Sequence, residues 1–135
     1  MYDTSDRLLV TFQRRAQKNE DLIVFGKDKL LDFCHIDDTV AGILHAVEKF
    51  EVAKNDVYNL GSGVGTRITD AANLIVETMG SSSHVVTKEN RPGEVMAHIL
   101  DITKASNTLG YEPRVHWTEG VRQTVAWYRS NPHAL

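Results

Sequence analysis

The sequence predicts an α/β fold, in which short strands alternate with amphipathic helices. Short apolar runs, of which "LIVF" at residues 22–25 is one example, are typical of buried strands. They alternate with segments in which apolar residues recur every three or four positions, which is the spacing of one helix face. The 135 residues suffice for one hydrophobic core, so we expect a single domain over residues 1–135.

The first sixty residues are expected to contain two helices and three strands. An approximate apolar stripe from Leu8 to Ala16 predicts the first helix. Asp37 or Asp38 is expected to cap the second helix, because a short acidic side chain can accept hydrogen bonds from the first free N–H groups. In chain order, the sequence predicts a helix at 7–19, strands at 22–25 and 30–36, a helix at 38–50 and a strand at 56–60.

The second half continues the same alternation after the loop "GSGVG" at residues 61–65. Gly80 and Gly110 are expected to end helices, because glycine tolerates the left-handed backbone that follows many helices. Asp101 and Thr118 are expected to cap the last two helices. In chain order, we expect a helix at 68–79, strands at 84–88 and 97–101, and helices at 102–109 and 119–129.

The composition excludes several classes of protein. A net charge of −3 argues against nucleic acid as the main partner, and the small basic cluster Arg14, Arg15 and Lys18 is typical of a solvated helix face. No apolar run approaches the ~18 residues of a membrane span, and no signal peptide opens the chain. The single Cys34 predicts a reducing, cytoplasmic setting. The abrupt polar start indicates a part of something larger.

The chemical motifs point to no catalytic, cofactor or metal site in this chain. The glycines at 61, 63 and 65 do not match the G-x-G-x-x-G dinucleotide fingerprint, so a loop between strand and helix is favoured. The six histidines are not paired at i, i+4 and no cysteine cluster accompanies them, which argues against zinc. None of the four tyrosines has a lysine four residues later that could lower its pKa. The acidic pair 37–38 is interpreted as part of a helix start.

The stretch "RPGE" at residues 91–94 predicts a rigid turn with a charge at each end. Pro92 fixes φ and Gly93 accepts the positive φ of a type II turn. Taken alone, Arg91 and Glu94 are consistent either with a binding site or with a solvated surface pair.

Five phrases in order resemble one family: "LIVFGKDKLLDFCHIDDTVAGI", "VYNLGSG", "NRPGEV", "LDITKASNTLGYEP" and "EGVRQTVAWYRSN". Together they resemble the C-terminal half of an extended short-chain dehydrogenase/reductase, in the NAD-dependent sugar-nucleotide epimerase/dehydratase group that includes UDP-glucose 4-epimerase. The resemblance implies a substrate-binding portion with the last strand and helices of the NAD-binding sheet, but without its glycine-rich half. The family's Gly-rich turn and Tyr-x-x-x-Lys pair do not occur in this chain. A fragment of this kind is expected to be catalytically inert and to bind no NAD alone, whereas the parent enzyme would hold NAD.

The resemblance also assigns substrate-binding roles. Arg91 is expected to bind the diphosphate, Glu94 the ribose hydroxyls, and the peptide groups of Ile23 and Phe25 the base. His98 matches a position beside the nucleotide. Two residues depart from the family pattern: Leu31 stands where many relatives have an arginine that contacts phosphate, so that Lys27 or Lys29 would have to compensate, and Glu94 replaces the usual aspartate.

The expected partners are a nucleotide-sugar, the N-terminal NAD-binding half of the same enzyme, and a second copy of the chain. The helix at 38–50 would lose its cover without that half, which exposes an apolar face at Val40, Ile43, Leu44 and Val47. Two alternatives stay open: a stand-alone sugar-nucleotide-binding module, or a structural or oligomerisation domain in which Arg91 forms an internal salt bridge.

Overall fold

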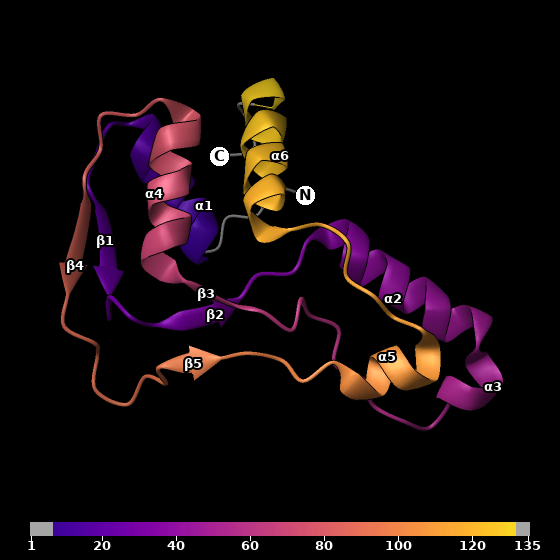
Figure 1. The fold of residues 1–135 in the computed structure, drawn as a ribbon. Helices are drawn as coiled ribbons and strands as arrows, with labels where there is room; N and C mark the ends of the chain where they lie inside the picture. Colours follow the sequence, from indigo (N-terminus) through magenta and orange to yellow (C-terminus); the bar gives the residue numbers. More distant parts are fainter. Residues whose placement is uncertain (1–6, 132–135) are drawn as a thin grey trace. The chain divides into compact units, whose positions relative to one another are not determined.

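The computed structural model describes residues 7–131, which form two compact units. Unit 1 contains the described residues up to Lys29, Arg67–Met96, and those from Val121 onward. Unit 2 contains Leu30–Thr66 and Ala97–Gly120. Helices and strands alternate along the chain, as the α/β prediction requires (Figure 1). The expectation that residues 1–135 act as a single domain stays a prediction.

Unit 1 combines a parallel pair of strands with packed helices. Strand β1 (Leu22–Phe25) pairs with β4 (Val85–Lys88), and helix α1 (Leu8–Gln17) packs against α4 (Ile68–Met79). Helix α6 (Trp117–Ser130) continues into this unit. Because successive strand residues point to opposite faces, β1 buries two side chains in the core and leaves the two others half-buried. The buried core residues of unit 1 include Phe12, Ala16, Leu22, Val24, Ala71, Ala72, Ile75 and Val125.

Unit 2 is built around a small sheet in the order β3-β2-β5. Strand β2 (Leu30–Asp32) lies between β3 (Gly65–Arg67), which crosses into unit 1, and β5 (Ala97–His98). β2 and β5 run parallel. Helices α2 (Ile36–Glu48), α3 (Phe50–Ala53) and α5 (Thr103–Leu109) belong to the same unit. Its core includes Ala105, Leu109 and Tyr111.

The helix ends confirm the glycine predictions and correct two caps. Gly80 and Gly110 have φ of +63° and +73° and end α4 and α5. Neither Asp37 nor Asp38 caps α2: the cap is His35, whose Nδ1 accepts the Asp37 N–H at 3.3 Å. Thr118 does not cap the last helix either, because α6 begins one residue earlier. The Asp101 carboxylate does accept the N–H of Thr103, at 2.9 Å, at the start of α5.

Three strand predictions need correction. Residues 56–60 form no strand, because a strand requires ladder hydrogen bonds and no described segment pairs with this apolar run. The strand predicted at 30–36 ends at Asp32, and that predicted at 97–101 ends at His98. The polar strand β3 was not expected, since Gly-Thr-Arg carries no apolar alternation.

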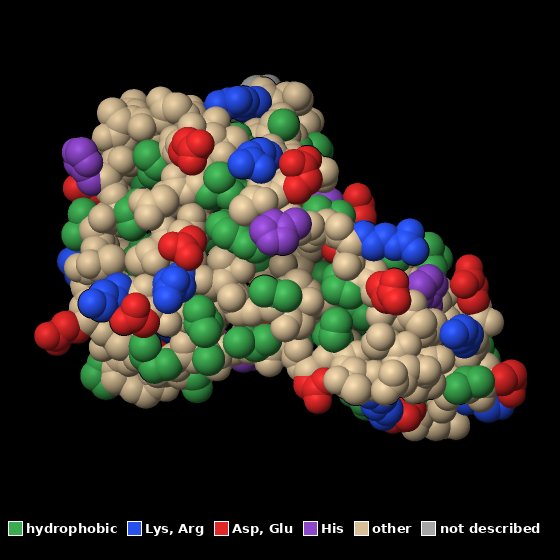
Figure 2. All heavy atoms as spheres, in the orientation of Figure 1, with side chains coloured by type: hydrophobic (Ala, Val, Ile, Leu, Met, Phe, Trp, Pro, Cys, Tyr) green, Lys and Arg blue, Asp and Glu red, His purple; other side chains and the backbone are tan. Residues whose placement is uncertain are grey.

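One face of α2 is apolar and exposed. Ile43, Leu44 and Val47 are 52%, 54% and 65% exposed, and Val40 is 45% exposed. Hydrophobic side chains, green in Figure 2, reach the surface among charged ones in the region of α2 and α3. No helix between residues 7 and 131 combines the length and the hydropathy of a membrane span.

Candidate functional site

The turn predicted at residues 91–94 is present. Gly93 has φ +82°, and the N–H of Glu94 donates to the carbonyl oxygen of Arg91 at 3.2 Å. A left-handed φ at this position requires glycine or strains any other residue. The two charged ends of the turn are therefore held on a fixed piece of backbone in unit 1.

The Arg91 side chain lies over an aromatic ring. Its guanidinium carbon is 4.0 Å from the centroid of the Phe25 ring, at the end of β1. A cation over an aromatic face is attracted by the negative potential of the ring, and Arg is well suited to such stacking. The side chain stays 60% exposed, so that the edge of the guanidinium is open to an anion. Stacking thus positions a permanent cation without using its hydrogen-bond donors.

Lys29 and Glu94 form a short ion pair beside Arg91. The Lys29 Nζ is 2.6 Å from Oε2 of Glu94, and Arg91 Nη1 is 3.8 Å from Oε1 of the same carboxylate. The side chains of Lys29 and Glu94 are only 13% and 34% exposed. The hydrogen bond from Lys29 lowers the pKa of Glu94; partial burial opposes this shift, and the charges of Lys29 and Arg91 reinforce it. Glu94 is therefore held as a carboxylate.

Asn90 fastens the turn, which sequence reasoning missed. Its side-chain amide donates to the carbonyl oxygen of Glu94 at 3.2 Å. A Cβ on Gly26 would lie 3.1 Å from Oδ1 of Asn90, and Gly26 also has φ +80°. The N–H of Gly26 donates to the Lys88 carbonyl oxygen at 2.9 Å. The end of β1 and the segment that leads into the turn are thus tied together.

The backbone of β1 has one paired and one unpaired edge. Leu22 and Gly26 donate their N–H groups to His84 and Lys88 on the β4 side. In a parallel pair, alternate residues face the same neighbour, so the peptide groups of Ile23 and Phe25 point away from β4. Among the described residues β1 pairs with β4 alone, so this edge has no strand partner there. The two residues predicted to contact a base are those with outward-facing peptide groups.

Five of the six predicted site residues belong to unit 1, and four of them are in contact: Phe25 with Arg91, and Glu94 with Lys29 and Arg91. His98 is exposed on β5, opposite Leu31 in the register, and belongs to unit 2. Its relation to the other five stays a prediction. Of the two lysines predicted to compensate for the missing arginine, Lys29 donates a hydrogen bond to Glu94, whereas Lys27 is exposed.

Asp32 explains the glycine-rich loop at 61–65. Its carboxylate accepts the N–H groups of Ser62 at 2.8 Å and Gly63 at 3.0 Å, the hydroxyl of Ser62 at 2.5 Å, and the N–H of Leu100 at 3.2 Å. These are the donors that a dinucleotide phosphate would need from such a loop. They already bind a carboxylate, which would repel a second anion. Asp32 therefore holds the loop against β2, a role that its position in the sequence did not predict.

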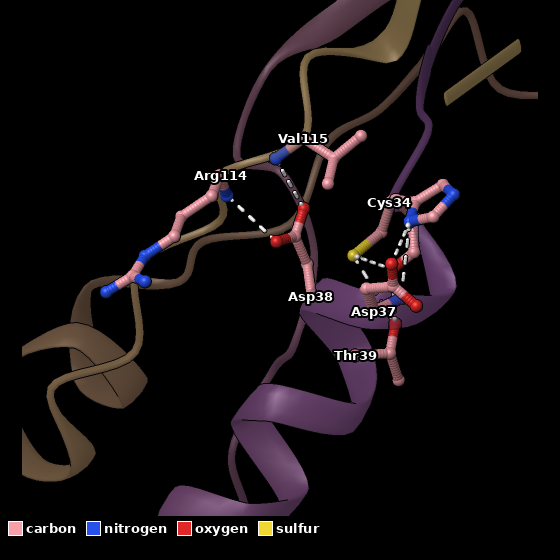
Figure 3. Close-up of polar contacts among 7 residues, drawn as sticks. Cys34, Asp37, Asp38, Thr39, Arg114 and Val115 are labelled. Atoms are coloured by element: carbon pink, nitrogen blue, oxygen red, sulfur yellow. Dashed lines mark hydrogen bonds and ion pairs between the residues drawn. The ribbon is translucent and has the colours of Figure 1, made fainter. Parts of the chain in front are cut away.

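The acidic pair at the start of α2 also has structural contacts (Figure 3). Asp38 is 4% exposed, and its carboxylate accepts the N–H groups of Arg114 at 2.8 Å and Val115 at 3.0 Å. Asp37 lies 3.6 Å from the His35 ring nitrogen, and Cys34 contacts the Thr39 hydroxyl at 3.4 Å. Among residues 7–131, no group of three His, Cys, Asp or Glu side chains is arranged to hold a metal ion.

Comparison with known proteins finds relatives that are enzymes of sugar-nucleotide chemistry. Residues 4–124 match the family model described as GDP-mannose 4,6 dehydratase. The chain is 29% identical over 128 residues to a dTDP-glucose 4,6-dehydratase of Actinoplanes sp., which covers 93% of this chain and 39% of that protein. This relative is an enzyme of the group predicted from the sequence.

Two solved structures are similar in fold. The UDP-glucose 4-epimerase of Thermotoga maritima, solved with UDP-glucose, superimposes with a TM-score of 0.82 at 34% identity, over 93% of this chain and 40% of that one. A UDP-glucuronic acid 4-epimerase from Bacillus cereus, in complex with UDP-glucuronic acid and NAD, gives a TM-score of 0.82 at 25% identity, with the same coverage of 93% and 40%.

The chain spans about two fifths of the length of these relatives. This share is what we expect of a C-terminal portion of the family fold. The phrases of the sequence, the α/β architecture and the matched family model agree. The chain therefore belongs to the GDP-mannose 4,6 dehydratase family, within the NAD-dependent sugar-nucleotide epimerases and dehydratases of the extended short-chain dehydrogenase type.

Proposed function

We propose that the chain is the nucleotide-sugar-binding part of an NAD-dependent sugar-nucleotide epimerase or dehydratase, and that it is catalytically inert alone. One observation carries the proposal: the Arg91 guanidinium lies over the ring of Phe25, a residue of β1, and one edge of β1 has no strand partner among the described residues. In this proposal the cation that binds phosphate lies against the same strand whose outward peptide groups bind the base. A nucleoside diphosphate has the matching parts, a base with hydrogen-bonding edges and two adjacent phosphates.

Each group of this site has a chemical role in the proposal. The peptide groups of Ile23 and Phe25 would hydrogen-bond the base, because a strand edge without a partner presents N–H and C=O groups that can form hydrogen bonds. Arg91 would bind phosphate oxygens, since its planar fork of donors matches their geometry. Glu94 would accept hydrogen bonds from the ribose through the carboxylate lone pairs that Lys29 does not use. The fixed turn reduces the entropy lost on binding.

The relatives support the substrate class. The Thermotoga maritima epimerase was solved with UDP-glucose, and the Bacillus cereus enzyme with UDP-glucuronic acid. By analogy, we propose a UDP-sugar or another nucleoside diphosphate sugar as the ligand. Reducing, cytoplasmic conditions fit the single Cys34, which the structure gives as a free thiol.

The cofactor belongs to another part of the parent enzyme in this proposal. The Bacillus cereus relative binds NAD. In this chain the N–H donors of the glycine-rich loop at 61–65, those of Ser62 and Gly63, are bonded to the Asp32 carboxylate. That arrangement does not fit a dinucleotide phosphate. We therefore expect the N-terminal half to hold NAD.

The two alternatives make different use of Arg91. A structural domain would hold Arg91 in an internal salt bridge, but its distance to Glu94 is 3.8 Å and Glu94 has a shorter partner in Lys29. The exposed guanidinium favours a role of Arg91 in ligand binding over a role in an internal salt bridge. A stand-alone binding module would use the same residues with no catalytic partner, and the reading frame of the parent separates it from an enzyme part.

Calorimetry tests the proposal directly. UDP titrated into the chain is expected to bind, whereas NAD is expected to give no heat in the micromolar range. Uridine serves as the control without phosphates and should bind much more weakly. Measurable NAD binding, or the absence of UDP binding at millimolar concentration, contradicts the proposal.

A further inference from the structure

Lys29 is a cation with little access to water. Its side chain is 13% exposed, and its backbone N–H and carbonyl groups are both hydrogen-bonded. The Lys29 N–H donates to Gly26 at 3.1 Å, and its carbonyl oxygen accepts the N–H of Ile68 at 3.1 Å. An ammonium in such a position needs a counter-ion, because desolvation without one is costly. Glu94, 65 residues away in the sequence, supplies it at 2.6 Å.

Two cations lie near the Glu94 carboxylate. Arg91 lies three residues earlier on the same turn, and Lys29 approaches from the end of the β1–β2 turn. The Glu94 carboxylate is hydrogen-bonded to Lys29 at 2.6 Å, whereas Arg91 lies 3.8 Å away from it. Without Lys29, the nearest cation for Glu94 would be Arg91. A carboxylate bonded to Arg91 would compete with any phosphate for the same guanidinium donors.

We propose that Lys29 is a positioning residue that neutralises Glu94 and thereby keeps the Arg91 guanidinium available for the diphosphate of the ligand. The inference rests on the proposed function and adds a cause for its affinity. The charges of Lys29 and Glu94 cancel locally, so that the site carries the uncompensated charge of Arg91 toward solvent. Stacking on Phe25 holds that charge in place without occupying its N–H groups.

Three variants separate this role from its rivals. Lys29→Met frees Glu94 to bind Arg91, and is expected to weaken the binding of UDP and of pyrophosphate about fivefold to tenfold, which is within the net contribution of one typical hydrogen bond. Glu94→Gln removes the competing carboxylate and should leave the affinity for pyrophosphate, which has no ribose for Glu94 to bind, equal to or higher than that of the unchanged chain. The double variant Lys29→Met/Glu94→Gln should bind pyrophosphate to within about twofold of the unchanged chain, as expected for coupled neighbours.

Pyrophosphate distinguishes the diphosphate from the ribose, because it contains no sugar. Glu94→Gln is expected to weaken UDP, whose ribose loses an acceptor, without weakening pyrophosphate; weaker binding of pyrophosphate by Glu94→Gln overturns the inference. Lys27→Met is the matched control: this exposed lysine lies on the same turn and should change both affinities less than twofold. An equal effect of Lys27→Met and Lys29→Met would mean general charge attraction and would also overturn it.

The measurements are dissociation constants from calorimetry, with a thermal melt for each variant. If Lys29→Met does not fold, Lys29→Gln replaces it in both the single and the double variant. A double variant that binds as weakly as the lysine variant contradicts the inference while leaving the proposed function intact. Absence of UDP and pyrophosphate binding by the unchanged chain contradicts the proposed function instead.

Discussion

Tyr111 donates its hydroxyl proton to the carbonyl oxygen of Gly61 across 2.8 Å, and its side chain is fully buried. The bond fixes the start of the loop that Asp32 holds from the other side. The Tyr111 hydroxyl also lies 3.5 Å from the Cys34 sulfur. A single buried phenol therefore connects three segments of unit 2.

Tyr111→Phe is expected to destabilise the chain by about 1–2 kcal/mol at pH 7, because it leaves the Gly61 carbonyl without its donor. Burial, the hydrogen bond with Cys34 and the nearby charges of Cys34, Asp38 and Asp32 raise the pKa of Tyr111 above its ordinary value. The phenol of the unfolded chain ionises near pH 10, whereas that of the folded chain stays neutral. This stabilising difference is therefore present below pH 10 and is lost as the pH rises further.

Urea unfolding at pH 7 and at several pH values above 10 measures both the destabilisation and its dependence on pH. The gap between the unchanged chain and Tyr111→Phe should narrow as the pH rises. Tyr58→Phe is the matched control, because Tyr58 is only half-buried and its ring lies under Lys104. Equal effects of the two substitutions, or a gap that widens with pH, would refute the argument.

Asp38→Ala should cost about 3 kcal/mol, since it leaves the N–H groups of Arg114 and Val115 without their charged acceptor in a buried place. Asp38→Asn keeps one oxygen acceptor and should cost less. Asp37→Ala is the neighbouring control, because that side chain is 77% exposed. Chemical denaturation gives the three values, and similar costs at positions 37 and 38 would contradict the assignment.

Arg91→Ala should weaken UDP binding by about 1.5–3 kcal/mol, the usual range for a hydrogen bond to a charged group. In a parent enzyme with its NAD-binding half, NAD affinity should hardly change. Arg122→Ala removes an exposed arginine on α6 and serves as the control. A dissociation constant for UDP within twofold of the unchanged chain would reduce Arg91 to a turn residue.

The exposed face of α2 predicts self-association of the isolated chain. It adjoins an apolar groove of about 350 Å³ lined by residues that include Ile43, Val47, Phe50 and Leu60. An apolar face of this kind favours docking of a second copy, with a buried interface of at least ~1,000 Å² around residues 38–60. Sedimentation at tens of micromolar should show dimers, and Val47→Glu should give monomers. Val64→Glu, exposed elsewhere in unit 2, should not. Monomers alone in the unchanged chain would refute this prediction.

The sequence predicted most where local pattern and packing agree. Ile68, Ala71, Ala72 and Ile75 are spaced as one helix face, and α4 buries all four. The segment at 56–60 contains three apolar residues but forms no strand, because pairing depends on a neighbour that spacing cannot reveal. The Pro-Gly turn was predictable from its own residues.

The long-range polar contacts were not predictable in this way. Lys29 and Glu94 lie 65 residues apart, and Asp38 and Val115 lie 77 apart. Nothing in the local spacing of these residues marks them as partners. The opposite charges at the two ends of the turn suggested an ion pair between Arg91 and Glu94. The shorter contact of Glu94 is with Lys29 instead.

The central claim is that the edge of β1 and the turn at 91–94 bind a nucleoside diphosphate. Titration of the isotope-labelled chain with UDP, followed by two-dimensional amide NMR, tests it residue by residue. The account predicts saturable shifts of the amide signals of Ile23, Phe25, Arg91 and Glu94, and little change along the outer face of α2. Shifts confined to other segments, or no shift at millimolar UDP, would contradict it.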